Sequence, residues 1–242
     1  MSRPIIAAAL LLLATAPASS FAEDWRGFRG NDGSGISREN VPVPASWSTT
    51  ENLRWSIELP GPGSSSPIVV GERVLVTSYS GYGHPIGNAG EIAGLKRHLL
   101  CLDRQSGELQ WQSTVSAVHP EDAYQGFITE HGYASSTPVS DGEVIVSFFG
   151  KAGVVAHDMQ GKQLWQTDIG KQSGTHLWGS AGSPILAGNV VIINASDESL
   201  SIRGLDKSSG KEIWKAEAKG LENTFCTPLL TSVAGRDEVI VS

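Results

Sequence analysis

Four histidines fall in segments that have no regular apolar pattern, where side chains are free to contact a ligand. His84, His119, His131 and His176 lie there with Tyr82, Tyr124, Tyr133, Trp178, Glu91, Glu121, Asp122 and Glu130. Imidazole nitrogens bind metals and transfer protons near neutral pH, and carboxylate oxygens bind Ca²⁺. We take His131, Tyr133, His176 and Trp178 as the candidate ligand-binding residues.

These side chains have a second interpretation, as surface groups that form hydrogen bonds or cap a channel. No pair of histidines has metal-site spacing, and the sequence contains no Gly-rich phosphate loop, no Cys-x-x-Cys and no haem motif. Glu121-Asp122 and Asp197-Glu198 could supply oxygen ligands to Ca²⁺, but a solvated acidic turn is the favoured interpretation. The sequence therefore predicts no metal site and identifies no catalytic residue.

A repeated pattern provides the framework that must position these side chains. Residues 101–111, 156–165 and 204–214 each contain an Asp, a Gly and then a Trp four residues after the Gly. The repeated residues are Asp103, Gly107 and Trp111; Asp158, Gly161 and Trp165; and Asp206, Gly210 and Trp214. With Trp55 included, successive tryptophans lie 56, 54 and 49 residues apart, a period typical of propeller blades. Each Asp is expected to accept hydrogen bonds from the backbone of its own turn.

Alternation of apolar and polar residues predicts four strands in each repeat. The predicted strands are 66–70, 73–79, 99–103 and 108–114 in the first blade, 135–140, 143–149, 153–158 and 162–167 in the second, and 183–187, 189–195, 201–206 and 211–217 in the third. Asp141-Gly142 is a strong hairpin signal. A Ser or Thr followed by Pro opens every innermost strand, where no backbone donor is needed. We therefore predict an all-β propeller of four-stranded antiparallel blades.

The strand pattern accounts for about three and a half blades. Residues 53–59 are predicted to form an outer strand that carries Trp55, and a fourth blade begins at Cys226 with two strands. Closed propellers have about 4 to 8 blades, so we expect this sequence to be the first part of a ring of seven or eight. A four-bladed ring that uses residues 53–59 as the outer strand of its last blade is the alternative.

Residues 1–22 have the features of a secretory signal peptide. Arg3 precedes an apolar run too short to span a bilayer, and small residues flank Phe21 at a plausible cleavage point. We expect residues 23–52 to form an irregular arm, residues 53–242 to form the partial propeller, and the exported protein to be periplasmic or secreted, with no membrane span. The net charge of −7 argues against nucleic acid as a partner, because that binding requires clustered Lys and Arg.

The pattern small-x-Asp-x-x-x-Gly-x-x-x-Trp resembles the tryptophan-docking repeat of the pyrroloquinoline-quinone (PQQ)-like, or quinoprotein-like, β-propellers. The resemblance covers residues 53–242 and implies that Trp111 lies on the peptide of Gly161 and Trp165 on that of Gly210. Residues 25–35 also look like the start of exported bacterial proteins of this family. Members include quinoprotein alcohol and sugar dehydrogenases, and the propeller subunit of the outer-membrane protein assembly machinery, which binds partners and is not an enzyme.

The expected function depends on which family features the sequence lacks. Quinoprotein alcohol dehydrogenases carry two adjacent cysteines, whereas the two cysteines here are Cys101 and Cys226, which we expect to be unpaired. With no cofactor site evident, we expect an exported binding or scaffold module, not an enzyme. The face that carries the loops 80–97, 116–134, 168–182 and 195–199 is expected to contact a protein partner or a small ligand. The alternative is an N-terminal fragment of a PQQ-dependent alcohol or sugar dehydrogenase, which would use PQQ and Ca²⁺.

Overall fold

The computed structural model describes residues 23–242 apart from 41, 86, 87, 218 and 219, and its described part is built from antiparallel β-sheets. Three sheets have four strands each, and a fourth has two. The strands are β1 Ile68–Val70, β2 Arg73–Ser80, β3 Lys96–Asp103, β4 Leu109–Ser116, β5 Val139–Ser140, β6 Val144–Phe148, β7 Val154–Asp158, β8 Gln163–Thr167, β9 Ile185–Ala187, β10 Val190–Ala195, β11 Ser201–Asp206, β12 Glu212–Glu217, β13 Leu229–Val233 and β14 Arg236–Ile240. The predicted all-β class with four-stranded antiparallel blades is confirmed.

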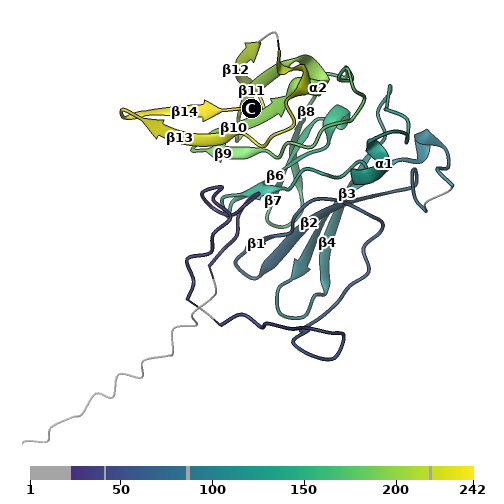
Figure 1. Cartoon of the computed structure of the whole chain (residues 1–242), viewed down its shortest axis with the longest axis vertical. Coiled ribbons are helices and arrows are strands. Elements are labelled where there is room, and N and C mark those ends of the chain that lie inside the picture. The colour runs from purple at the N-terminus through teal and green to yellow at the C-terminus, as the bar shows by residue number, and fades with distance from the viewer. Residues whose placement is uncertain (1–22, 41, 86–87, 218–219) are drawn as a thin grey trace, which may run out of the picture.

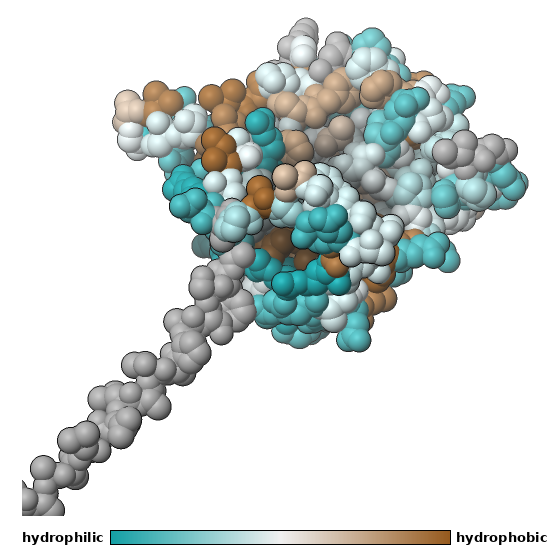
Figure 2. All heavy atoms as spheres, turned by 60° about the horizontal axis from the view of Figure 1, so that its bottom comes forward, coloured by the Kyte–Doolittle hydropathy of each residue, from teal (hydrophilic) through white to brown (hydrophobic). Residues whose placement is uncertain are grey.

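Short helices occur only in connections among the described residues. They are η1 Ile92–Gly94, α1 Ile128–His131, η2 Gly150–Ala152, α2 Ser196–Ser199 and η3 Leu221–Asn223. Figure 1 shows the three four-stranded sheets following one another in chain order, with the β13–β14 hairpin extending away from them. Apolar side chains lie exposed on this hairpin, as Figure 2 shows, including Leu229, Val233 and Ile240.

Two sequence predictions about strands are wrong. Residues 53–59 form no strand, because the segment has no backbone partner to pair with among the described residues, although its Trp55 is still docked. The predicted strand 135–140 shortens to β5, Val139–Ser140. The reason is that Pro138 has no N–H to donate, while Ser136 and Thr137 form hydrogen bonds to the neighbouring blade.

The core lies between the sheets, so each sheet uses both of its faces. Ile145 of β6 packs in the cluster that joins the first and second sheets, and its neighbour Val146 packs in the cluster that joins the second and third. Both side chains are fully buried. Successive residues of a strand point to opposite faces, which explains why four of the five residues of β6 are apolar.

Hydroxyl groups before the strand-opening prolines connect the blades at their inner edges. The backbone N–H of Ser66 donates to Thr137 Oγ1, and the N–H of Thr137 donates to Ser183 Oγ. The N–H of Ser183 in turn donates to Thr227 Oγ1, and the N···O distance is 3.0 Å in all three hydrogen bonds. In the described residues, each of the first three blades thus donates one such hydrogen bond to the blade that follows it. The Ser/Thr-Pro pattern therefore has a physical role beyond starting the strand.

Tryptophan rings connect the blades at their outer edges. A Cβ atom added to Gly161 would lie 2.5 Å from the ring of Trp111, and one added to Gly210 would lie 2.5 Å from Trp165. Each indole also donates its N–H to the next blade, from Trp111 to the carbonyl of Met159 and from Trp165 to that of Lys207. Trp55 makes the same contact with Gly107 and donates to the carbonyl of Arg104.

The repeated aspartates close the turns that present these glycines. Asp103 Oδ1 accepts the backbone N–H groups of Gln105 and Ser106 at 2.8 Å. Asp158 and Asp206 accept equivalent backbone hydrogen bonds in their own turns. Trp214 contacts Gly204 of its own sheet, where an added Cβ would lie 2.2 Å from the indole.

Replacing Gly161 by alanine should lower the free energy of unfolding by about 2 to 3 kcal/mol. Its φ of +85° disfavours any Cβ, and the indole of Trp111 leaves no space for one. The matched control is Gly188→Ala, since Gly188 has φ +57° but no atom within 4 Å of the added Cβ; we expect it to cost about 1 kcal/mol. Urea denaturation measures both, and equal losses would contradict a specific role for indole docking.

The segment that precedes the first sheet lies along its inner edge. Trp25 forms an isolated antiparallel bridge with Val69 of β1, with both N–H···O distances at 2.9 Å. The carbonyl of Arg26 accepts the N–H of Ser140 in β5, so the segment bridges the first and second blades.

The proposed signal peptide, residues 1–22, lies outside the described residues. None of the helices in the described ranges has the length and apolar character needed to cross a membrane.

Candidate functional site

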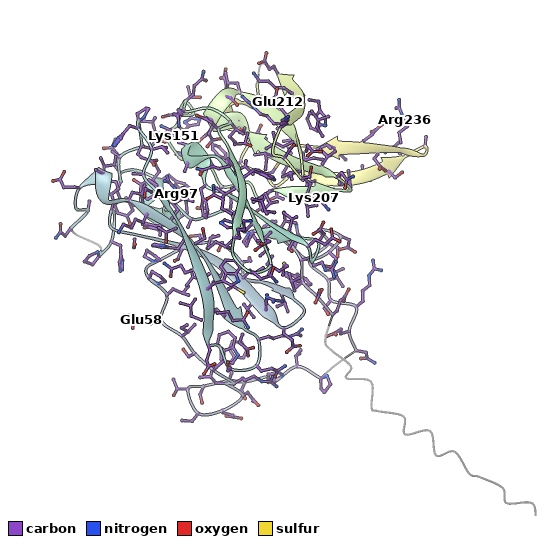
Figure 3. All side chains as sticks on the ribbon, turned by 180° about the vertical axis from the view of Figure 1, so that it is seen from behind. Glu58, Arg97, Lys151, Lys207, Glu212 and Arg236 are labelled. Atoms are coloured by element: carbon purple, nitrogen blue, oxygen red, sulfur yellow. The ribbon has the colours of Figure 1, made fainter. Side chains whose placement is uncertain are left out.

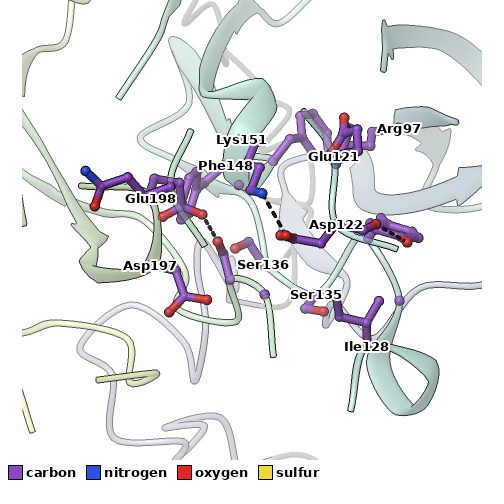
Figure 4. A pocket seen from close by; sticks show the side chains of 17 residues that line it. Arg97, Glu121, Asp122, Ile128, Ser135, Ser136, Phe148, Lys151, Asp197 and Glu198 are labelled. Carbon is purple, nitrogen blue, oxygen red and sulfur yellow. Dashed lines mark hydrogen bonds and ion pairs between the residues drawn. The ribbon is translucent and has the colours of Figure 1, made fainter. Parts of the chain in front are cut away.

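Four connections on one face of the sheets, together with the start of strand β3, converge on a small cavity of about 40 Å³. They are the β4–β5, β6–β7 and β8–β9 connections and the β10–β11 connection, which contains helix α2, and we call this face the looped face. Its charged lining residues are Arg97, Glu121, Asp122, Lys151, Asp197 and Glu198. Figure 4 shows these side chains converging from separate strands and loops. The cavity is therefore assembled by the tertiary fold from distant parts of the sequence.

Arg97 and Glu121 form a buried ion pair at one end of the cavity. Nη1 and Nη2 of Arg97 donate to Oε1 and Oε2 of Glu121, each at 2.8 Å, and the side chains are 4% and 1% exposed. Glu121 Oε1 also accepts the N–H of Val118, and the Arg97 guanidinium lies 5.6 Å from the ring centroid of Tyr133. This pair anchors the β4–β5 connection to the start of β3.

Lys151 connects two other loops across the cavity. It lies in η2, on the tight connection between β6 and β7, and its side chain is 6% exposed. Its Nζ donates to Asp122 Oδ1 and to Ser173 Oγ, each at 2.7 Å, and Ser173 Oγ donates to the same carboxylate oxygen at 2.6 Å. The β4–β5 and β8–β9 connections are thereby held together through one ammonium group.

Asp197 and Glu198 place carboxyl groups in the cavity without full partners. Both residues are buried in α2, directly after the apolar strand β10. Both oxygens of Asp197 and the Oε2 of Glu198 lack a hydrogen-bond partner, and Glu198 Oε1 accepts the hydroxyl of Ser180. In Figure 4 no interaction is drawn to the Asp197 carboxylate.

Burial perturbs both of these acids. Desolvation, reinforced by the charge of Asp122, raises the pKa of Asp197 to about 6. Desolvation, reinforced by the charge of Asp197, raises the pKa of Glu198 to about 8. Glu198 is therefore largely protonated at neutral pH, and any cation that binds here must compete with its proton.

Aromatic side chains form an exposed surface beside the cavity. Trp178 stacks on His176 with ring centroids 4.7 Å apart, and it lies 5.1 Å from both Phe127 and Phe225. Phe127 is 52% exposed and Trp178 is 37% exposed. Gly179 and Ser180, which directly follow Trp178, line the cavity. The looped face thus combines a buried acidic cavity with a planar aromatic surface.

The four candidate ligand-binding residues separate into two groups. His131, His176 and Trp178 meet in the aromatic surface, where His131 Nε2 donates to the carbonyl of Trp178 at 2.6 Å and its Nδ1 lies 2.6 Å from Ser135 Oγ. Tyr133 instead lines the cavity and packs in a tyrosine cluster, and its hydroxyl donates to the carbonyl of Asp122. His84 and His119 are exposed and line neither surface.

The sequence pattern did not single out the cavity residues as a group. The solvated acidic turn that the sequence favours is wrong for both acidic pairs: Asp197 and Glu198 are buried, and the side chains of Glu121 and Asp122 are 1% and 18% exposed and paired with Arg97 and Lys151. Lys151, Asp197 and Glu198 lie in short connections that directly follow mostly apolar strands, whereas Arg97 lies within β3. In the described ranges no three His, Cys, Asp or Glu side chains are arranged to hold a metal ion.

The consecutive four-stranded sheets and their docked tryptophans define a β-propeller repeat protein. Residues 95–242 match the family model described as outer membrane protein assembly factor BamB. The match covers more than half of the chain, and the chain belongs to this family of PQQ-like β-propeller repeat proteins.

Comparisons with individual proteins find both dehydrogenases and BamB. Polyvinylalcohol dehydrogenase of Pseudomonas sp is 26% identical over 213 residues, and the match covers 81% of this chain and 29% of that protein. The polyvinylalcohol dehydrogenase of Sphingopyxis sp. (strain 113P3) is 22% identical over 206 residues, and the match covers 80% of this chain and 28% of that protein. Among solved structures, BamB from Moraxella catarrhalis has 17% identity and a TM-score of 0.48, covering 75% of this chain and 46% of its own. Quinohemoprotein alcohol dehydrogenase from Comamonas testosteroni has 15% identity and a TM-score of 0.49, covering 80% and 27%. The chain spans less than a third of the length of the curated relatives it matches.

Proposed function

We propose that this chain is part of an exported PQQ-dependent dehydrogenase that oxidises hydroxyl groups, and that its cofactors bind at the looped face. The observation that supports this most is the set of three buried carboxylate oxygens without a partner, beside an exposed tryptophan. Burying an unpaired carboxylate costs free energy, and strongly perturbed carboxyl groups cluster at functional sites. A scaffold module, which the sequence alone favoured, has no need of such groups.

The carboxylates of Asp197 and Glu198 fit a hard divalent cation such as Ca²⁺. Their free oxygens are the donor type that Ca²⁺ takes, and a cavity of about 40 Å³ has room for an ion with a little water. Two carboxylates make only part of a shell of about six to eight oxygens. The remaining ligands would come from hydroxyl groups, water and the cofactor.

The quinone fits the aromatic surface and not the cavity, which is too small to enclose a fused ring system. Trp178 is partly exposed and stacks on the ring of His176, so its indole offers a flat apolar surface for a planar ring. Arg97 and Lys151 are already paired with Glu121 and Asp122. We therefore do not assign them to the carboxylates of the quinone.

In this proposal each group of residues has one role. The quinone, when bound, supplies the acceptor for the two electrons released as a hydroxyl-bearing carbon becomes a carbonyl. Asp197 and Glu198 hold the cation, and Trp178 holds the ring plane. His131 fixes the loop of Trp178 by donating to its carbonyl oxygen. The similarity to polyvinylalcohol dehydrogenases supports a hydroxyl-bearing substrate.

Calcium binding by the purified chain tests the proposal. After EDTA treatment, titration calorimetry at pH 7.5 should detect one Ca²⁺ site. Asp197→Asn should weaken binding by roughly 10- to 100-fold, because the site loses one of two ligand charges. Glu58→Gln is the matched control, since Glu58 is exposed, does not line the cavity, and lies away from Arg97 and Lys151 in Figure 3.

Quinone binding is the second measurement. With Ca²⁺ present, PQQ should quench the tryptophan fluorescence, and Trp178→Ala should weaken this binding while leaving Ca²⁺ affinity largely unchanged. If the chain binds neither Ca²⁺ nor PQQ, the dehydrogenase proposal fails. Recovery of one defined protein partner from envelope extracts would then favour the scaffold function.

A further inference from the structure

Lys151 is a buried cation that lies in the cavity without pairing with the two free carboxylates. Among the ion pairs of the described residues, its partner is Asp122, and its second hydrogen bond goes to Ser173. Lys151, Asp197 and Glu198 line the same cavity of about 40 Å³, so the charge of Lys151 acts on both carboxyl groups over a short distance. Lys151 therefore adds positive charge to the cavity without occupying the free oxygens.

The lining residues determine the charge that the cavity carries once all of its acids are ionised. Two cationic side chains, Arg97 and Lys151, face four carboxylates at positions 121, 122, 197 and 198. With all four acids ionised, as in a cation complex, two negative charges remain uncompensated. That excess matches one divalent cation. In a water-poor cavity a mismatch of one charge is costly, because Coulomb interactions are little screened there.

We propose that Lys151 determines which cation the cavity accepts, by holding the uncompensated charge at two. This inference rests on the proposed cation site at Asp197 and Glu198 and adds a selectivity residue to it. Lys151 acts at a distance, so it is not a ligand. Removing its charge leaves three uncompensated carboxylates, which favours a trivalent ion. Removing the charge of its partner Asp122 leaves one, which disfavours a trivalent ion further.

The geometry separates selectivity from simple loop support. Lys151 is held by Asp122 and Ser173 from two different loops, so its position is fixed relative to the cavity. An arginine at this position keeps the charge, whereas a methionine keeps most of the apolar stem and loses the charge. A role in loop support alone would make both variants bind every cation more weakly by the same factor. A role in selectivity changes the ratio of two affinities.

The test is competition between Ca²⁺ and Tb³⁺ on the metal-free chain, followed by terbium luminescence sensitised by tryptophan. Lys151→Met should raise the ratio of Tb³⁺ to Ca²⁺ affinity at least tenfold. Lys151→Arg should leave this ratio within about threefold of the unmodified chain, a difference of less than 1 kcal/mol. Asp122→Asn should lower the ratio. Far-UV circular dichroism checks that each variant retains its sheets.

The outcomes distinguish the two proposals. If the unmodified chain binds Ca²⁺ at a site that Asp197→Asn weakens, but Lys151→Met and Asp122→Asn leave the affinity ratio unchanged, only the selectivity role of Lys151 is overturned. If Lys151→Met fails to fold, the direction of the Asp122→Asn shift decides the question by itself. If the unmodified chain binds neither ion, the cation site and the role of Lys151 both fail.

Discussion

Replacing Arg97 by methionine should destabilise the protein by about 3 to 5 kcal/mol. The substitution leaves the carboxylate of Glu121 buried at 1% exposure without its charged partner. Glu121 also anchors the β4–β5 connection through the N–H of Val118, so the loop that contributes Asp122 to the cavity should loosen as well. Urea denaturation followed by circular dichroism gives the free energy, and amide hydrogen exchange reports the loop.

Two further variants show whether the loss comes from an uncompensated charge. In the double variant Arg97→Met, Glu121→Gln, the buried charge is gone, and we expect at least half of the stability to return. Arg236→Met breaks the pair with Glu238, whose side chains are 81% and 42% exposed, and should cost less than about 1 kcal/mol. Similar losses for Arg97→Met and Arg236→Met would show that burial of the Arg97 pair has no special weight.

The metal-free protein should lose about 2 kcal/mol of stability as the pH rises from 6.5 to 8. Burial, with the neighbouring charge of Asp197, raises the pKa of Glu198 to about 8. The folded state therefore retains a proton that the unfolded chain has already released. A raised carboxyl pKa gives stability that is complete below the unfolded value and disappears as the pH passes the folded value. Thermal unfolding in EDTA across this range measures the loss.

The pH range begins at 6.5 because below this value the protonation of buried histidines would change the stability in the opposite direction. Burial lowers the pKa of His98 and His157, and groups of this kind reduce stability as the pH falls below about 6.5. Glu198→Gln should abolish the loss between pH 6.5 and 8. Saturating Ca²⁺ at pH 8 should restore stability if the cation replaces the proton. A flat profile in EDTA would indicate that Glu198 is not protonated in the folded state.

The repeat could be predicted from the sequence because each of its contacts requires one residue type at a fixed position of the repeat. Trp111, Gly161 and the turn at Asp158 recur at a nearly constant spacing, and each requires a particular residue type: a flat ring, an absent Cβ and a short acceptor. Strand positions followed from apolar alternation, and errors arose where pairing depends on a partner. Residues 53–59 have strand-like alternation but no strand beside them among the described residues.

The cavity could not be read in the same way because its members share no local pattern. Lys151 and Asp197 lie on different connections, and only the stacking of sheets brings them together. The burial of Asp197-Glu198 was also invisible, since two adjacent acids in a connection usually face water. His176 and Trp178 were recognisable because they are two residues apart in one loop, whereas Phe127 and Phe225 come from other loops.

The hydroxyl links at the inner edges also bear on how such rings change size during evolution. Ser66, Thr137, Ser183 and Thr227 form the same type of N–H to hydroxyl hydrogen bond at the three junctions between the described blades. A gene duplication that inserts a blade brings its own acceptor and its own donor, so both new junctions are complete at once. Deletion of a blade leaves neighbours that are already compatible. A change in the number of blades therefore requires no new type of contact at the inner edge.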